Sequence, residues 1–228
     1  MAKPAVLRFA RPTHQRRAEQ TSEAVALAAL AALQDRDYEQ ISVAELAKRA
    51  GISVGGFYAR YRSKEALLPV LAAHVLDDCR VALDKALEAT ADGTIEEIVA
   101  AYAGTMVKKF RQHRHAAIQL RRHARGGDRR VATAIREFND HVHERIRSLL
   151  RNRRSDIGHR DPDLAIEFGL FAASASAREA VLADSLQVYE VAIDDRQLIA
   201  EITRAWVNYL APRAPQPARP AKRARRKS

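Results

Sequence analysis

Cysteine, strand-like patterns and long apolar runs are scarce in this sequence, and each scarcity excludes a class of protein. The 228 residues include one cysteine, Cys79, so no internal disulfide can form. No run of eighteen apolar residues occurs and the N-terminus lacks the apolar segment of a secretory signal, so we expect a cytoplasmic protein without a transmembrane helix. Cys79 lies among Leu76, Ala82 and Leu83, which is typical of a buried, small apolar side chain.

Catalytic and metal-binding motifs are also missing. No G-x-S-x-G, P-loop or G-x-G-x-x-G pattern occurs in a fitting context, so we expect neither an enzyme nor a cofactor. The histidines at 113 and 115, and those at 141 and 143, are two residues apart, which directs them to different sides of a helix. No H-E-x-x-H occurs, and we therefore expect no metal site.

Positive charge is concentrated at the two ends of the chain. The net charge is +11, of which residues 1–20 carry +4 and residues 213–228 carry +7, so residues 21–212 are balanced. Either end would add affinity for a polyanion or simply be solvated. Within the balanced part, residues 108–154 hold fifteen Lys or Arg against four Asp or Glu. Paired helix faces and a basic pocket for an anionic ligand both explain this segregation.

The pattern that the sequence does contain is helical throughout. Ala, Leu, Arg and Glu dominate, and the sequence predicts an all-α protein of about nine helices. Cap residues predict where helices start: Ser42 with Glu45, Ser53, Ser63, Thr94 with Glu97, Asp128, and Asp161 before Pro162. The expected helices span about 15–35, 42–50, 63–89, 94–110, 113–125, 128–153 and 194–210, with a short one from Ser53 and a long one from Asp161. Pro69 lies six positions after Ser63, where it predicts either a hinge or a harmless bend.

Residues 42–61, SVAELAKRAGISVGGFYARY, read as helix, glycine turn and short helix. This is a helix-turn-helix arrangement, in which the second helix enters a major groove of DNA. Ala47 is small enough for the two helices to approach, and Phe57 and Tyr61 are spaced to press the second helix onto the first.

Two adjacent glycines, Gly55 and Gly56, lie in this second helix. Glycine costs a helix interior about 1 kcal/mol relative to alanine. Two explanations are open. Either the helix backbone must come close to DNA, or the glycines relieve crowding between helices.

Residues 21–68 resemble the DNA-binding domain of the TetR-type family of bacterial transcriptional regulators. The resemblance rests on the apolar first helix, on ISVAELAKRAGIS, on the G-x-x-Y from Gly55 to Tyr58, on Tyr61, and on Ser63-Lys64-Glu65. It implies a ligand-released repressor that binds a palindromic operator in double-stranded DNA as a homodimer. An architectural or nucleoid-associated protein without an inducer is the alternative.

The resemblance also divides the chain. The expected units are a basic flexible arm over 1–14, a DNA-binding domain over 15–65, a ligand-binding and dimerisation domain over 66–211, and a disordered basic tail over 212–228. An unknown small-molecule effector is expected in the third unit. The effector, the operator and the regulated genes are not predicted.

DNA contacts follow from the resemblance position by position. Ser42 and Ser53 match cap positions that also touch phosphates, and Lys64 matches a lysine that contacts the DNA backbone. Arg60 stands where a histidine is common, and Gly56 and Ala59 replace side chains that often read bases. We therefore expect fewer direct base contacts, and that Arg60 reads a guanine is a hypothesis. The expected contact residues are Ser42, Ser53, Val54, Gly55, Gly56, Tyr58, Arg60 and Lys64.

The C-terminal helices carry two weaker expectations. Aromatic and apolar residues that should surround a ligand pocket, although each is equally suited to an ordinary core, are Tyr102, Met106, Phe110, Phe138, Phe168 and Phe171. The last two helices resemble those that pair with their mates in a family dimer. The expected interface residues are Phe171, Ala172, Ala175, Ile202 and Trp206.

Overall fold

The computed structural model describes residues 10–183, 185–188 and 192–211. Every regular element in these ranges is a helix and none is a strand, which confirms the predicted all-α class. Ten α-helices and three short 3-10 helices occur there. In the same ranges, no helix has both the length and the apolar character that crossing a membrane requires.

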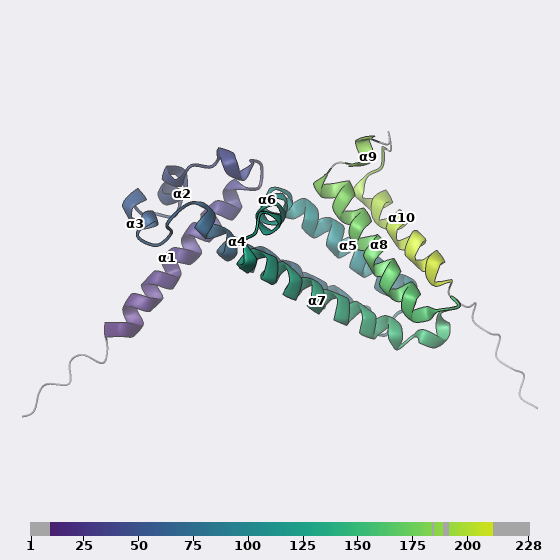
Figure 1. Cartoon of the computed structure of the whole chain (residues 1–228). Helices are drawn as coiled ribbons and strands as arrows, with labels where there is room; N and C mark the ends of the chain where they lie inside the picture. The colour runs from purple at the N-terminus through teal and green to yellow at the C-terminus, as the bar shows by residue number, and fades with distance from the viewer. Residues whose placement is uncertain (1–9, 184, 189–191, 212–228) are drawn as a thin grey trace, which may run out of the picture.

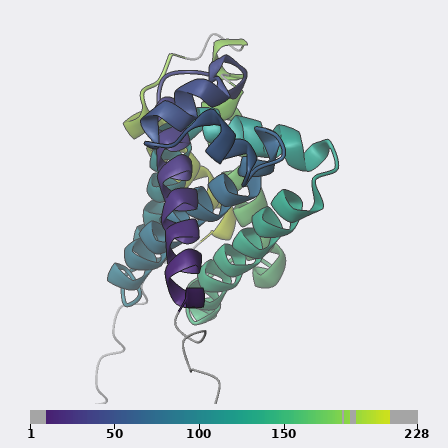
Figure 2. The ribbon, with the colours of Figure 1, turned by 90° about the vertical axis from the view of Figure 1, so that its left-hand side faces the viewer.

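The N-terminal unit consists of short helices around one long one. Its elements are α1 (Ala10–Ala32), η1 (Tyr38–Gln40), α2 (Val43–Arg49) and α3 (Val54–Tyr58). Figure 1 shows this unit at one end of the molecule, and Figure 2 turns it toward the viewer. Helix α1 packs against α2 and the start of α4, so it supports the helix-turn-helix from behind.

The larger C-terminal bundle follows without a break. Helix α4 packs against α5 and α7, while α10 packs against α5 and α8 (Figure 1). Helix α6 lies across the end of the bundle that faces the N-terminal unit. The elements are η2 (Glu65–Leu67), α4 (Leu68–Ala89), α5 (Ile95–Gln112), α6 (Arg114–Arg125), α7 (Arg129–Arg151), η3 (Arg154–Asp156), α8 (Pro162–Leu182), α9 (Ser185–Val188) and α10 (Asp195–Leu210).

Most helix starts are where the cap residues predicted them. Thr94 and Glu97 form the full reciprocal capping box, and Asp161 accepts from the Leu164 backbone N–H before Pro162. At Ser42 only half of the expected box forms. Ser42 Oγ accepts from the Glu45 backbone N–H at 3.1 Å, but the Glu45 carboxylate turns instead to Arg36, 2.5 Å away. A charged partner competes better for that carboxylate than a backbone N–H does.

Pro69 lies in the first turn of α4, not inside it. The turn that precedes it is the 3-10 helix η2, so the α-helical pattern restarts at Leu68. In a first turn the missing N–H of proline removes no hydrogen bond. The sequence expectation of an α-helix running on from Ser63 is therefore wrong, and Pro69 has no α-helical turn before it to kink.

Some boundaries differ from the expected ones. Helix α1 begins at Ala10 and ends at Ala32, whereas the sequence predicted 15–35, so residues 10–14 of the expected flexible arm are helical. The rest of that arm, residues 1–9, and the expected tail, residues 212–228, lie outside the described residues. Helices η1, η3 and α9 were not predicted, because three or four residues are too few to establish a helical period.

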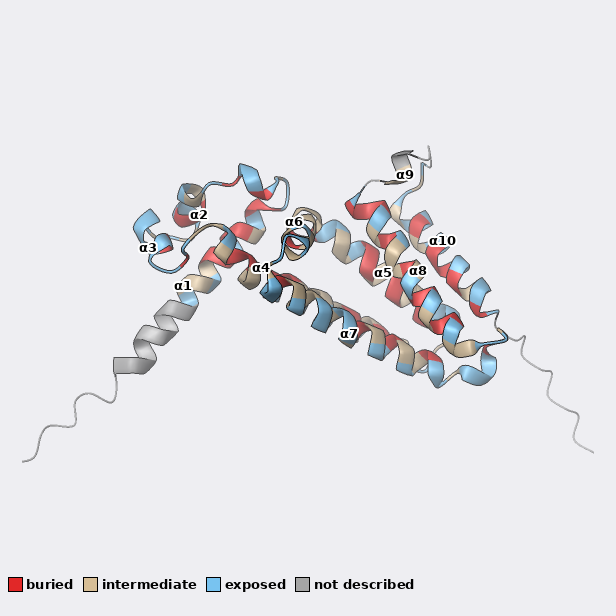
Figure 3. Ribbon diagram, viewed as in Figure 1, coloured by how far each residue is buried: buried red, intermediate tan, exposed pale blue. Residues whose placement is uncertain are grey.

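The molecule has two apolar cores, drawn as the red faces in Figure 3. The N-terminal core continues along α4 through Leu71 and Val75, and it also takes in Ala116, Leu120 and Val131 from α6 and α7. The division at residues 65 and 66 stays a prediction, and this core extends across it. The N-terminal unit is therefore packed onto the bundle through α4, α6 and α7.

Candidate functional site

The turn between α2 and α3 is built around one glycine. Gly51 has a φ of +69°, the left-handed conformation that glycine adopts without steric cost. Its N–H donates to the Lys48 carbonyl at 3.2 Å, and the Ile52 N–H donates to the Ala47 carbonyl at 2.9 Å. These two bonds form a Schellman motif, which closes α2 and sends the chain into α3.

Helix α3 is held from beneath by aromatic side chains. Phe57 is fully buried against Leu46 and Ala47 of α2, and its ring lies 5.2 Å from that of Tyr61. The Tyr61 hydroxyl is 2.6 Å from Ser22 Oγ, so α1 is tied to the end of the motif. This packing fixes a helix of only five residues that would not be stable alone.

The opposite face of α3 is open to solvent. Ser53 caps the helix, its Oγ accepting from the Gly56 N–H at 2.9 Å. Val54 is 43% exposed and Tyr58 is 52% exposed, so both side chains face solvent. Gly55, Gly56, Ala59 and Arg60 are also exposed. Most of the predicted contact residues thus share one surface.

The two glycines of α3 do not pack against a neighbouring helix. A Cβ added at Gly55 would meet only Ser53 Oγ, at 3.9 Å, whereas one added at Gly56 would crowd that same cap atom at 3.3 Å and meet Ile52 Cβ at 3.8 Å. Neither glycine has a positive φ. Crowding between helices therefore does not explain the two glycines, and the α3 backbone at these positions is exposed to solvent.

Ser42 and Lys64 are the two predicted contact residues outside residues 53–60, and they differ in exposure. Ser42 is exposed at the start of α2. Lys64 is half-buried, and its ammonium donates to the carbonyls of Tyr38 at 2.7 Å and Ile41 at 3.0 Å. It also lies 4.4 Å from the centre of the Tyr38 ring. Two of its three N–H donors are therefore used within the protein, which favours a structural role over the predicted contact with DNA.

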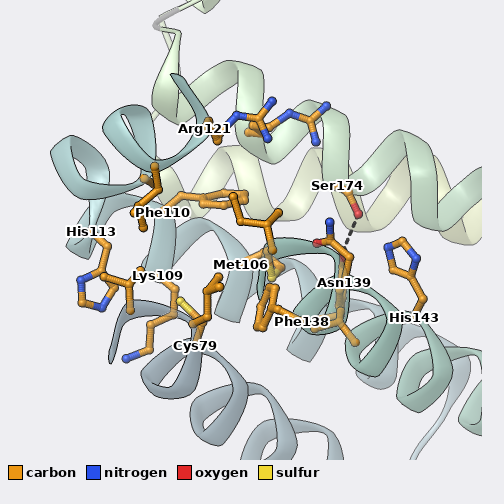
Figure 4. Close-up of a pocket in the computed structure, with 18 of the residues that line it drawn as sticks. Cys79, Met106, Lys109, Phe110, His113, Arg121, Phe138, Asn139, His143 and Ser174 are labelled. Carbon is orange, nitrogen blue, oxygen red and sulfur yellow. Dashed lines mark hydrogen bonds between the residues drawn. The ribbon is translucent and has the colours of Figure 1, made fainter. Parts of the chain in front are cut away.

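A cavity of about 330 Å³ lies in the C-terminal bundle between helices α4 to α8. Five of the six residues predicted for a pocket line it: Tyr102, Met106, Phe110, Phe138 and Phe171. Figure 4 shows Met106, Phe110 and Phe138 around this space. Its size and its largely apolar walls are typical of a small-molecule site.

Phe168 does not line this cavity. It is 50% exposed on the outer face of α8, in line with Ala172, whereas Leu170, Phe171 and Ser174 line the cavity. Phe168 and Phe171 are three residues apart and lie on neighbouring positions of one helical face, so the sequence alone did not show that only Phe171 reaches the cavity.

Polar side chains at this cavity were not predicted one by one. Tyr102 Oη and Ser174 Oγ are 2.5 Å apart, the contact dashed in Figure 4. Burial lowers the pKa of His143 and raises that of Cys79 to about 12, so both are uncharged near neutral pH. Arg121 and Arg178 also line the cavity. The basic segment 108–154 contained the signal for Arg121, whereas nothing in the sequence singled out Arg178.

The outer faces of α8 and α10 carry exposed aromatic side chains. Phe168 lies 5.4 Å from Tyr209 and 6.1 Å from Phe171, ring centre to ring centre, and Leu164 is also half exposed. Between these helices runs a hollow of about 220 Å³ that includes Ala172 and Ser176. We call the four exposed side chains, Leu164, Phe168, Phe171 and Tyr209, the outer apolar strip.

Ile202 and Trp206 do not belong to that strip, in contrast to the predicted interface. They are 5% and 2% exposed, because both side chains pack into the core of their own chain. Trp206 packs directly against Gly169, where an added Cβ would come within 1.9 Å of its Nε1. At most they form the floor of the hollow between α8 and α10. Ala175 is half-buried.

Comparison with known proteins agrees with these features. Residues 27–71 match the family model described as "Bacterial regulatory proteins, tetR family". The matched segment contains the whole helix-turn-helix and the start of α4. No curated protein matches the chain.

Solved structures share the fold over most of the chain. A TetR-family transcriptional regulator from Streptomyces coelicolor is 17% identical with a TM-score of 0.65, over 85% of this chain and 81% of that one. A transcriptional regulator from Rhodococcus sp. Rha1 is 18% identical with a TM-score of 0.65, over 83% and 96%. A TetR-family regulatory protein from Rhodococcus RHA1 is 15% identical with a TM-score of 0.61, over 83% and 96%.

The motif and the fold lead to one conclusion. Residues 27–71 match the family model, the helix-turn-helix has the expected geometry, and the helical bundle is shared with these structures. Residues 27–71 therefore form a DNA-binding helix-turn-helix of the TetR family of bacterial regulatory proteins, and the chain as a whole shares the fold of solved TetR-family regulators.

Proposed function

We propose that the protein is a ligand-released repressor that binds a palindromic operator as a homodimer. In this proposal the exposed face of α3 enters the major groove, and the outer apolar strip joins two copies. A small molecule in the cavity of the bundle lowers the affinity for DNA. Each part is supported by a different feature of the chain.

The proposed reading surface is supported above all by the bare backbone at Gly55 and Gly56. Both lie in a helix where glycine costs stability, neither has a positive φ, and a Cβ at Gly55 would have room. Close approach of DNA to the helix backbone accounts for them. Ser53, Tyr58 and Arg60 flank this patch, and Arg60 is the side chain that we propose for bidentate contact with a guanine.

Dimerisation is supported by the length of α3 and by the outer apolar strip. A helix of five residues reads few base pairs, and two copies about 34 Å apart would read successive turns of the groove. Half-exposed Leu164 and Phe168, with Phe171 and Tyr209, offer the apolar centre that a subunit interface needs.

Ligand control is supported by two residues that the cavity shares with the N-terminal core. Val75 of α4 and Leu120 of α6 line the cavity and also belong to the apolar core beneath the helix-turn-helix. Helix α6 is further joined to the N-terminal unit by ion pairs, His115 to Asp37 at 2.9 Å and Arg122 to Glu39. A molecule that displaces α6 would therefore shift the helix-turn-helix, and the two states would differ in DNA affinity.

A footprint on the DNA that flanks the protein's own gene tests the proposal. The full chain is bound at moderate salt with an excess of random competitor DNA. Discrete, symmetric protected sites would support a regulator of a palindromic operator. Uniform coverage would overturn it in favour of the architectural alternative.

The variant Gly55→Ala tests the reading surface itself. Because a Cβ has room there, unfolding should be unchanged or up to about 1 kcal/mol harder, while operator affinity falls about tenfold or more. Gly104→Ala in α5 is the matched control, since its Cβ would meet only Ile199 at 3.9 Å. It should leave operator affinity unchanged. Equal operator affinities in the two variants would contradict the proposed contact.

A further inference from the structure

The charged side chains around the cavity are mostly neutralised by partners within the protein. Lys109 Nζ and His113 Nε2 each lie 2.7 Å from Asp78 Oδ2. Glu167 is paired in the same way with Arg147, whose Nη2 is 2.9 Å from its Oε2. The charges of these groups are paired within the protein and need no counter-ion from a ligand.

Arg121 of α6 and Arg178 of α8 are different. Among the described residues, Arg121 has no hydrogen bond and no ion pair. The Nε of Arg178 is buried without a hydrogen bond, and its ion pair with the exposed Glu179 is 3.6 Å long. That distance is too long for a hydrogen bond. Buried donors are normally satisfied, so a missing acceptor is indicated at this position.

The two guanidinium groups are close enough to affect each other. Burial first, and then the positive charge of Arg178, lower the pKa of Arg121, although it stays protonated at any ordinary pH. Arg125 adds to this repulsion, and the exposed Glu179 offsets it in part. An anion between Arg121 and Arg178 would turn a repulsive pair into a binding site.

These two arginines also separate the cavity from a second hollow. That hollow has a volume of about 310 Å³, and its wall includes Arg122 and Arg125 in addition to Arg121 and Arg178. Figure 4 shows Arg121 on the side of the cavity opposite to Cys79. The apolar cavity and this basic hollow therefore share Arg121 and Arg178 in their walls.

We propose that the cavity binds an organic anion with an apolar body, such as a carboxylic acid or a phosphate ester. The apolar body would lie among Met106, Phe110 and Phe138, and the anionic oxygens would bind between Arg121 and Arg178. Arginine forks match such oxygen groups, whereas a neutral or cationic molecule would supply no anionic hydrogen-bond acceptor to either guanidinium group. This inference rests on the proposed function, because it specifies the effector of the same cavity.

Binding of matched probes tests the inference directly. Trp206 is the only tryptophan, and its ring lies 5.8 Å from that of Tyr102 at the cavity wall, so its fluorescence should report occupancy. The full chain is titrated with decanoate, decyl phosphate, decan-1-ol and decylamine, and with 2-naphthoate and 2-naphthol. Calorimetry repeats each titration. The anions should bind about tenfold or more tightly than their neutral counterparts, and decylamine should bind most weakly. Decanoate and decyl phosphate distinguish a carboxylate from a phosphate ligand.

Two arginine variants and one control complete the test. Arg121→Gln and Arg178→Gln should each weaken binding of the anions about tenfold and leave binding of the alcohols unchanged. Arg136→Gln, at an exposed arginine of α7 outside both hollows, should change neither. Equal binding of acids and alcohols, unchanged anion affinity in both variants, or binding of none of the probes would overturn the inference.

Operator binding separates this inference from the proposed function. An anion that binds as expected but leaves operator affinity unchanged supports the anion site and contradicts ligand-released repression. Release of the operator by decan-1-ol as readily as by decanoate supports repression and contradicts the anion site.

Discussion

Lys64 and Tyr38 bind each other reciprocally across 26 positions of sequence. The Lys64 ammonium donates to the Tyr38 carbonyl at 2.7 Å, and the Tyr38 hydroxyl donates to the Lys64 carbonyl at 2.5 Å. Burial raises the pKa of Tyr38, so its hydroxyl remains a donor. Together the two residues fasten η1 to the segment that leads into α4. They stabilise the platform on which α3 is presented.

We expect Lys64→Met to lower the free energy of unfolding by about 1–3 kcal/mol, because two buried carbonyls lose a charged donor. Chemical denaturation of the purified chain measures the change. Lys85→Met, at an exposed position of α4, is the control and should have little effect. A loss of operator affinity with no loss of stability would instead identify Lys64 as a DNA contact.

Gly169→Ala should destabilise the chain strongly, by about 3 kcal/mol or more, because the new Cβ would overlap Trp206. Thermal unfolding followed by circular dichroism measures it. Gly104→Ala should be neutral or slightly stabilising under the same conditions. Similar melting temperatures for the two variants would show that α8 and α10 do not pack as described.

Stability should depend on pH through the Glu167 and Arg147 pair. The hydrogen bond from Arg147 holds the pKa of Glu167 below its ordinary value, although burial opposes this. A carboxyl group with a lowered folded pKa stabilises the fold above its unfolded pKa of about 4.3 and loses that contribution as the pH falls through the folded value.

Glu167→Gln should therefore reduce the unfolding free energy by up to about 1 kcal/mol at neutral pH, and by progressively less as the solution is acidified below about pH 4. Denaturation at a series of pH values measures the difference. Glu137→Gln, at an exposed position of α7, serves as the control. A difference that stays constant down to the most acid condition would rule out this ion pair as its origin.

A double substitution in the outer apolar strip tests the proposed dimer. Leu164→Glu with Phe168→Glu should convert a dimer to a monomer and lower operator affinity about a hundredfold or more, since the two reading helices would no longer be linked. Light scattering after size exclusion gives the mass. Val81→Glu, at an exposed valine of α4, should leave both properties unchanged. A wild-type monomer at working concentration would refute this part of the proposal.

Local signals in the sequence were sufficient for most of the secondary structure. The cap residues at Ser53, Thr94 and Asp161 act on groups three residues away, so their effect is readable without tertiary information. Glu45 was misread because its partner, Arg36, lies outside the local pattern. The position of Pro69 was misread because the turn before it is 3-10 rather than α-helical.

The site was predictable to the extent that it is local. The α3 surface lies within a few residues of sequence, and most of its predicted members are exposed together. The cavity is assembled from five helices, so its arginines become neighbours only through the packing of α6 against α8. Likewise, Phe168 and Phe171 are neighbours on one face of α8, and periodicity does not decide which of them reaches the cavity.

Val75 and Leu120 belong both to the wall of the cavity and to the N-terminal core, and this limits how substitutions can alter the protein. A substitution at either position alters the shape of the cavity and, at the same time, the packing beneath the helix-turn-helix. If the cavity is where the effector binds, selectivity for a new chemical signal and baseline occupancy of the operator cannot be adjusted independently at these two positions. If the proposed repressor function holds, variants that respond to other compounds would need compensating changes on the DNA-facing side to retain their operator affinity.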